Sequence, residues 1–196
     1  MFWRYTSKLT VWLAAALMGC AAPATLAVQD AHCPDPAPRA SNDAPPPETD
    51  TPKPAATRLI LVRHAEKVDA SEDAALSPEG HARAAALATA LADAEVSAIY
   101  SSDYQRTRDT VAPLAAATGL EIQLYDPAEA AVLAGPLVAR HAGQTVLVVG
   151  HSPSVPAMIN ALVGEERVSR LERYDQLFVV VADEDGAALL VMRYGE

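Results

Sequence analysis

Short apolar runs and longer stretches rich in Ala and Leu alternate from residue 58 to residue 163. Each run is short and unbroken, as expected of a strand covered on both faces of a sheet, whereas each longer stretch has the length of a helix. The predicted strands span residues 58–62, 96–100, 120–125 and 145–149. The predicted helices span residues 78–94, 103–118, 128–141 and 152–163.

Local signals mark the ends of these elements, and a hairpin follows them. Ser77 can cap the first helix, Pro78 fits its first position, and Gly119 ends the second helix. Two further apolar runs, 176–181 and 187–193, are joined by a short acidic turn and are expected to form a hairpin. This order predicts an α/β domain. It is a three-layer α/β/α sandwich whose sheet is mostly parallel, with one antiparallel strand in the C-terminal hairpin.

The chain divides into three segments by composition. Residues 1–20 are predicted to be a signal peptide, because basic residues precede an apolar run only about half as long as a membrane-spanning helix. Residues 21–57 hold nine of the fifteen prolines and are predicted to be a disordered linker without a core. Residues 58–196 are predicted to form the folded domain, which is long enough for a core of its own.

The end of the first segment, Leu17-Met18-Gly19-Cys20, resembles the lipobox of bacterial lipoproteins. The resemblance implies that Cys20 becomes the lipidated first residue of the mature chain. The chain would then lie in the bacterial cell envelope or periplasm and contact the membrane only through this N-terminal anchor. Ordinary signal cleavage among the alanines that follow is the alternative, and it would leave the chain soluble in the periplasm or secreted.

Composition excludes several classes of function. The formal net charge of −10 argues against non-specific nucleic-acid binding, which needs a clustered positive field. The two cysteines, Cys20 and Cys33, both precede the predicted domain. The domain is therefore expected to lack a disulfide framework, a Cys-rich zinc site and a catalytic thiol.

Chemically active side chains follow the predicted strands, at the edge of the sheet where α/β proteins bind ligands. Arg63 and His64 follow the first strand, Arg106 the second, and His151 the fourth. Arg offers planar paired donors to phosphate oxygens, and a neutral imidazole can attack phosphorus. The helix predicted to start at Ser152 adds backbone N–H groups that suit an anion. This set favours phosphoryl transfer.

Three motifs carry a resemblance to a known family. They are Leu61-Val62-Arg63-His64-Ala65-Glu66-Lys67, the segment from Ser101 to Thr110, and Gly150-His151-Ser152. In order and spacing they resemble the motifs of the histidine phosphatase superfamily, which has the phosphoglycerate mutase-like fold. The resemblance implies that His64 is the nucleophile that forms a phosphohistidine. It also implies that Arg63, Arg106 and His151 hold the phosphoryl oxygens, without a metal or other cofactor.

The chain departs from the family pattern at two places. Ala65 stands where Gly is usual, and the proton donor is not evident because only a short segment separates the third and fourth strands. The short segment indicates a small branch of the family with a minimal lid. Asp126 is the best-placed candidate acid, since it follows a strand end, and an ordinary surface turn is an equal alternative. Glu66 and Glu129 are weaker candidates.

We therefore expect an exported phosphomonoesterase that acts on a phosphorylated small molecule or envelope component. A serine esterase is disfavoured, because no histidine follows the Gly150-His151-Ser152 segment in the chain order that such enzymes need. A metal hydrolase is disfavoured because paired arginines would repel a dication. The remaining alternative is a non-catalytic envelope module that binds a phosphorylated partner.

Overall fold

The structure, a computed structural model, describes residues 55–195, and its main feature is a single six-stranded sheet. The strands lie in the order β3-β2-β4-β1-β5-β6. Their bounds are Thr57–Arg63 for β1, Val96–Ser102 for β2, Ile122–Tyr125 for β3, Thr145–Gly150 for β4, Gln176–Asp183 for β5 and Gly186–Arg193 for β6.

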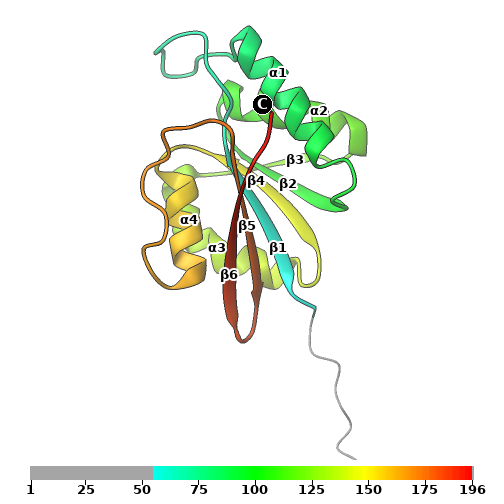
Figure 1. Cartoon of the computed structure of the whole chain (residues 1–196), viewed down its shortest axis with the longest axis vertical. Helices are drawn as coiled ribbons and strands as arrows, with labels where there is room; N and C mark the ends of the chain where they lie inside the picture. The colour runs from blue at the N-terminus through cyan, green and yellow to red at the C-terminus, as the bar shows by residue number, and fades with distance from the viewer. Residues whose placement is uncertain (1–54, 196) are drawn as a thin grey trace, which may run out of the picture. The chain divides into compact units, whose positions relative to one another are not determined.

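The directions of the strands agree with the prediction. Strands β3, β2, β4 and β1 pair in parallel, whereas β5 runs antiparallel to both of its neighbours, β1 and β6. The β5–β6 pair is the predicted C-terminal hairpin, which crosses the lower half of Figure 1. The α/β fold with a mostly parallel sheet and one antiparallel strand is confirmed.

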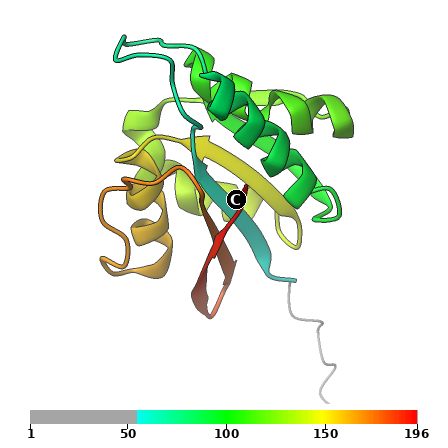
Figure 2. The same cartoon turned by 45° about the horizontal axis from the view of Figure 1, so that its top comes forward.

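Helices cover both faces of the sheet, which makes three layers (Figures 1 and 2). Helices α1 and α2 pack together on one face, and α3 and α4 pack together on the other. Their bounds are Pro78–Ala90 for α1, Gln105–Thr118 for α2, Ala130–Arg140 for α3 and Ser154–Val163 for α4. Strands β1 and β4 are buried on both faces, which explains their unbroken apolar runs.

The ends of the helices show how local sequence shapes the fold. The Ser77 side chain accepts a hydrogen bond from Gly80 N and Pro78 takes the first helical position of α1, as predicted. Gly119 ends α2 in the left-handed conformation, at a φ of 72°. The third predicted helix begins instead as a short 3₁₀ turn, η1 (Pro127–Glu129), and α4 begins at Ser154 rather than at residue 152.

The predicted signal peptide, the lipidation site Cys20 and nearly all of the predicted linker lie outside the described residues. Strand β1 begins at Thr57, whose hydroxyl donates to the carbonyl oxygens of Val138 and His141. The predicted domain boundary near residue 57 remains a prediction. No helix within residues 55–195 is long and apolar enough to cross a membrane.

Candidate active site

Two histidines meet where the central parallel strands end. Arg63 and Gly150 are paired residues of β1 and β4, so the residues that follow them, His64 and His151, emerge side by side. The backbone N–H of His64 donates to the Gly150 carbonyl at 2.9 Å, and the centroids of the two imidazole rings lie 5.4 Å apart. The fold therefore brings the two histidines together at one edge of the sheet, as predicted.

His64 is held in one orientation and one tautomer. Its side chain is buried, and its Nδ1 lies 2.7 Å from the carbonyl oxygen of Ala65. Because a carbonyl oxygen only accepts, Nδ1 carries the proton and Nε2 keeps a free lone pair. The backbone N–H of Ala65 donates in turn to the hydroxyl of Thr110, which fixes the turn after β1.

Burial keeps His64 neutral. Desolvation lowers its pKa from 6.5 to about 3, and the positive charges of Arg63 and Arg106 act in the same direction, against the opposing effect of the Ala65 hydrogen bond. The imidazole is thus unprotonated at neutral pH, which is the state that a nitrogen nucleophile requires.

His151 is oriented by a series of hydroxyl groups. Its Nδ1 lies 3.4 Å from Nη2 of Arg106, which can only donate, so Nδ1 accepts and Nε2 carries the proton. That proton is donated to Ser102 Oγ at 2.8 Å, and Ser102 donates onward to Thr107 Oγ1 at 3.2 Å. Desolvation, followed by the charge of Arg106, lowers the pKa of His151 to about 4.

Arg106 projects from the first turn of α2 into the same space. Its guanidinium lies over the ring of Tyr104, 4.4 Å from the ring centroid, and its Nη1 donates to the Glu72 carbonyl at 2.6 Å. Its Nε is buried and has no hydrogen-bond partner among the described residues. A buried donor without a partner is costly.

Arg63 makes a similar arrangement on the other side of His64. Its guanidinium lies 4.1 Å from the ring centroid of Tyr174 and donates to the carbonyl oxygens of Leu171 and Glu172. Desolvation is the main cause of its lowered pKa. Its Nε, like that of Arg106, is buried without a partner in the described part of the chain. Two fixed cations with spare donors therefore flank two neutral imidazoles.

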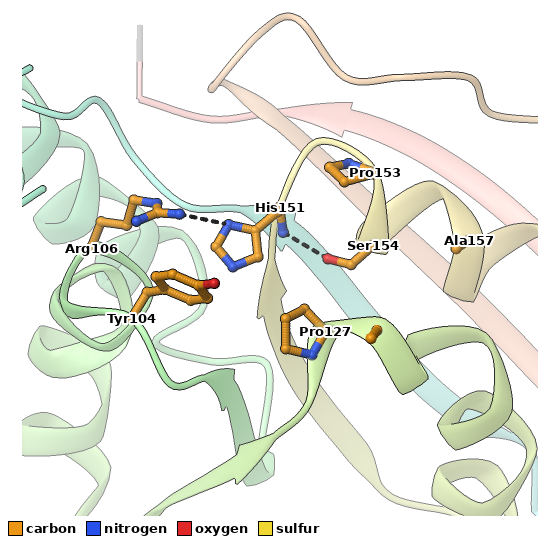
Figure 3. Close-up of a pocket in the computed structure, with 8 residues that line it drawn as sticks. Tyr104, Arg106, Pro127, His151, Pro153, Ser154 and Ala157 are labelled. Atoms are coloured by element: carbon orange, nitrogen blue, oxygen red, sulfur yellow. Dashed lines mark hydrogen bonds between the residues drawn. The ribbon is translucent and has the colours of Figure 1, made fainter. Parts of the chain in front are cut away.

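A cavity of about 470 Å³ opens beside His151. Figure 3 shows Tyr104 and Arg106 on one side of it, Pro127 on a second side, and the start of α4 on the third. The site can thus hold an anion between the histidines and the arginines, with the rest of a ligand in the cavity. Within residues 55–195, no group of three or more His, Cys, Asp or Glu side chains is arranged to hold a metal ion.

Two predicted site residues take up other roles in this structure. The Ser152 hydroxyl is buried and donates to the carbonyl oxygen of Leu171, so its side chain does not face the cavity. Asp126 accepts a hydrogen bond from Ala128 N at 2.9 Å, which caps η1, and its side chain lines an adjoining cavity. The site therefore brings together Arg63, His64, Arg106 and His151, but not these two side chains.

The weaker acid candidates also lie apart from the cavity. Glu66 forms a salt bridge with Arg83, whose Nε lies 2.7 Å from its Oε1. Arg83 donates as well to the carbonyl oxygens of Tyr194 and Gly195, which ties the turn after β1 to the end of β6. Glu129 is exposed in η1.

Several side chains of the site escaped the sequence analysis. Ser102, Tyr104 and Thr107 lie inside the second motif, so their position was a signal, but nothing in the sequence says which of them contacts His151. Tyr174 contacts the His64 ring at a centroid distance of 5.8 Å. It lies in the irregular chain between α4 and β5, which carries no pattern that could have pointed to it.

Comparisons with known proteins agree with this geometry. A family model described as the histidine phosphatase superfamily (branch 1) matches residues 59–127, which contain the first two motifs. The chain matches no curated protein sequence.

Solved structures extend the likeness to the rest of the domain. SixA of Agrobacterium tumefaciens, a candidate phosphohistidine phosphatase, is 26% identical, with a TM-score of 0.55 over 69% of this chain and 97% of its own. The SixA structure from Nakamurella multipartitia, also a candidate phosphohistidine phosphatase, is 28% identical, with a TM-score of 0.55 over 74% of this chain and 100% of its own. YhfR of Bacillus stearothermophilus is 17% identical, with a TM-score of 0.61 over 69% of this chain and 96% of its own, which shows a shared fold. With the family match, these structures confirm that the chain resembles the histidine phosphatase superfamily, as its three motifs predicted.

Proposed function

We propose that the domain is a phosphatase that hydrolyses phosphomonoesters through a phosphohistidine at His64. The observation that carries the proposal is the pair of buried Nε–H groups of Arg63 and Arg106, which lack partners among the described residues beside the free Nε2 of a neutral His64. The match to the histidine phosphatase superfamily and the phosphatase structures of similar fold support phosphatase activity.

The first step is transfer of the phosphoryl group. His64 Nε2 forms a bond to phosphorus while the bond from phosphorus to the ester oxygen breaks, and the alcohol or phenol leaves with a proton from an acid or from water. The two guanidinium groups hold the phosphoryl oxygens, where negative charge is spread in the transition state. A phosphate dianion near His151 favours its protonated form, which then donates from Nδ1.

The second step regenerates the enzyme. Water attacks the phosphorus of phosphohistidine, the bond to Nε2 breaks, and inorganic phosphate is released. Because Nδ1 of His64 keeps its proton through the hydrogen bond to Ala65, the ring returns to the same tautomer after each turnover. We propose that neither step needs a metal, because the two arginines supply the positive charge that a metal would supply.

The proton donor for the first step is proposed to be Asp126, which lines the adjoining cavity. That cavity and the one beside His151 share Tyr104 and Pro127, so the two are neighbours. Its carboxylate caps η1, and donation to a substrate would require Asp126 first to take up a proton from water and to release Ala128 N. Substrates with good leaving groups would not need this donor.

A quenched-flow experiment tests the covalent step. The chain is mixed with a ³²P-labelled aryl phosphate and quenched in alkali, and the phosphoprotein is tested for acid lability, which distinguishes phosphohistidine from phosphoserine. His64→Ala is expected to abolish both the labelled species and turnover. His81→Ala, a change of an exposed histidine in α1, is the matched control and is expected to leave both unchanged. Full turnover in His64→Ala would exclude the proposed mechanism.

A panel of phosphate compounds addresses the class of substrate. Simple alkyl and aryl monoesters belong in it, and so does a phosphohistidine peptide, because two similar structures carry the name of phosphohistidine phosphatase candidates. If the purified chain binds phosphate but turns over none of these compounds, the non-catalytic alternative, a module that binds a phosphorylated partner, is favoured.

We further propose that the chain acts in the bacterial cell envelope and is anchored through lipidated Cys20. The support is the Leu17-Met18-Gly19-Cys20 sequence and the basic and apolar residues before it. Cys20→Ala is expected to accumulate as a full-length precursor or to move to the soluble fraction. A variant that stays with the membrane at mature size would show that Cys20 is not the anchor.

A further inference from the structure

The cavity beside His151, which would receive the part of the substrate beyond phosphorus, has mainly apolar walls. Figure 3 shows the Tyr104 ring facing Pro127 across the opening, with Pro153 and Ala157 along the start of α4. Ala128 completes the lining, and the volume is about 470 Å³, which is the size of a small-molecule site.

Most polar groups that line this cavity are already engaged, although the Tyr104 hydroxyl makes no hydrogen bond to another described residue. The hydroxyl of Ser154 accepts a hydrogen bond from the backbone N–H of His151 at 2.9 Å. The Arg106 guanidinium, which is proposed to hold the phosphoryl group, donates to the Glu72 carbonyl and contacts His151. No further cationic side chain lines the cavity within the described part of the chain. A second negative charge on the substrate would therefore compete with the phosphoryl group for this one cation.

Carboxylates lie just outside the cavity. Asp103 and Asp126 line the adjoining cavity, which is separated from the first only by the shared Tyr104 and Pro127. Both side chains are exposed. Asp103 is paired with Arg108, whereas Asp126 contacts only a backbone N–H among the interactions described, so the nearby surface carries negative charge. This charge would repel an anionic group that extended out of the cavity while Asp126 is ionised, before it takes up the proton that it is proposed to donate.

We propose that this cavity selects small phosphomonoesters whose leaving group is a neutral aromatic ring without a second anionic group. The inference rests on the proposed phosphatase function and deepens it. An aromatic ring gains from contact with the proline, alanine and tyrosine side chains. A carboxylate in the same place loses part of its hydration without gaining a cation of its own, which is costly.

A matched pair of substrates tests the selection in the full chain. The pair is the phosphate ester of 4-hydroxyphenylacetamide and that of 4-hydroxyphenylacetate, in which a methylene insulates the ring so that the two phenols leave equally well. The value of kcat/KM is expected to be about ten-fold or more higher for the neutral amide, because the cavity offers the carboxylate no cation besides the one that holds the phosphoryl group. Equal values, or a preference for the carboxylate, would overturn the proposed selectivity while leaving the phosphatase function in place. Hydrolysis of neither ester would overturn the proposed function and the selectivity together.

A charge placed in the wall tests the cavity as the cause. Ala128→Lys introduces a cation at an exposed position of the lining and keeps the backbone N–H that Asp126 uses. The preference for the amide is expected to fall by about three- to five-fold, the scale of one surface ion pair. Ala139→Lys, at an exposed position near the C-terminal end of α3 and lining a different cavity, is the matched control and is expected to keep the parent ratio. An unchanged ratio in Ala128→Lys, or an equal fall in Ala139→Lys, would show that this cavity does not select the leaving group.

Discussion

Because His64 is neutral in the folded chain, we expect the unfolding free energy of the chain to depend on pH. In the folded chain its pKa is lowered from 6.5 to about 3, mainly by burial. The unfolded chain therefore binds a proton at His64 as the pH falls through 6.5, whereas the folded chain does not until about pH 3. Because a proton then favours the unfolded state, the stability contributed by neutral His64 is fully present above pH 6.5 and is progressively lost toward pH 3.

The size of the effect follows from the same values. At pH 5 the pH lies about one and a half units below the pKa of His64 in the unfolded chain. Proton binding to the unfolded chain therefore lowers the unfolding free energy by about 2 kcal/mol between pH 7 and pH 5. The pKa of His151 is lowered to about 4, and its side chain is less buried than that of His64. Solvent screening reduces its contribution to about 1 kcal/mol. The chain should therefore lose about 3 kcal/mol of unfolding free energy through these two groups.

Urea denaturation at pH 7 and pH 5 measures this loss. His64→Gln removes the titrating group and is expected to reduce the pH-dependent loss by about 2 kcal/mol, whatever its effect on stability at pH 7. His81→Gln, at an exposed position, is the control and is expected to leave the loss unchanged. A His64→Gln chain that loses as much stability as the parent between the two pH values would refute the claim that burial keeps His64 neutral. The proposed state of the nucleophile would fall with it.

Three further predictions concern the residues around the histidines. Ser102→Ala removes the acceptor for His151 Nε2–H, so kcat should fall about ten-fold and the unfolding free energy should fall by about 1–2 kcal/mol. Ser71→Ala, a change in an exposed turn, is the control for both measurements. Asp126→Asn should slow esters with poor leaving groups by about 10²–10⁴ and hardly affect activated aryl esters, and an equal effect on both would remove Asp126 from the mechanism. Hydrolysis should survive treatment with a metal chelator, and activity lost to the chelator and restored by a divalent ion would favour a metal hydrolase.

The strands could be predicted because their signal is local. Strands β1 and β4 are buried along nearly their whole length, so most of their positions are apolar or small. The predicted bounds differ from the observed ones by no more than one residue at each end. Strand β2 extends further than predicted, to Ser102, because its last residues are buried polar groups that hydropathy does not mark as strand. The positions of His64 and His151 followed from the ends of β1 and β4.

The unpredicted parts depend on contacts between residues far apart in the chain. Ser152 looked like the start of a helix, but its hydroxyl donates to the carbonyl of Leu171, and the chain enters α4 two residues later. The same irregular chain places Tyr174 against Arg63 and His64. A sequence pattern depends on residues that are close along the chain. The contacts of Ser152 and Tyr174 join residues that are far apart in the chain, so no pattern could predict them.

The contacts of the two tyrosines explain how the two arginines of the site are held in place. On one side Tyr174 lies against His64 and under the guanidinium of Arg63, and on the other Tyr104 lies against His151 and under that of Arg106. A guanidinium stacked on a ring and bonded to backbone carbonyls has already lost its side-chain freedom. Binding of a phosphate then requires little further ordering of the two arginines. Because the two guanidinium groups are held in place before the substrate arrives, they can stabilise developing charge with little reorganisation, which favours electrostatic catalysis.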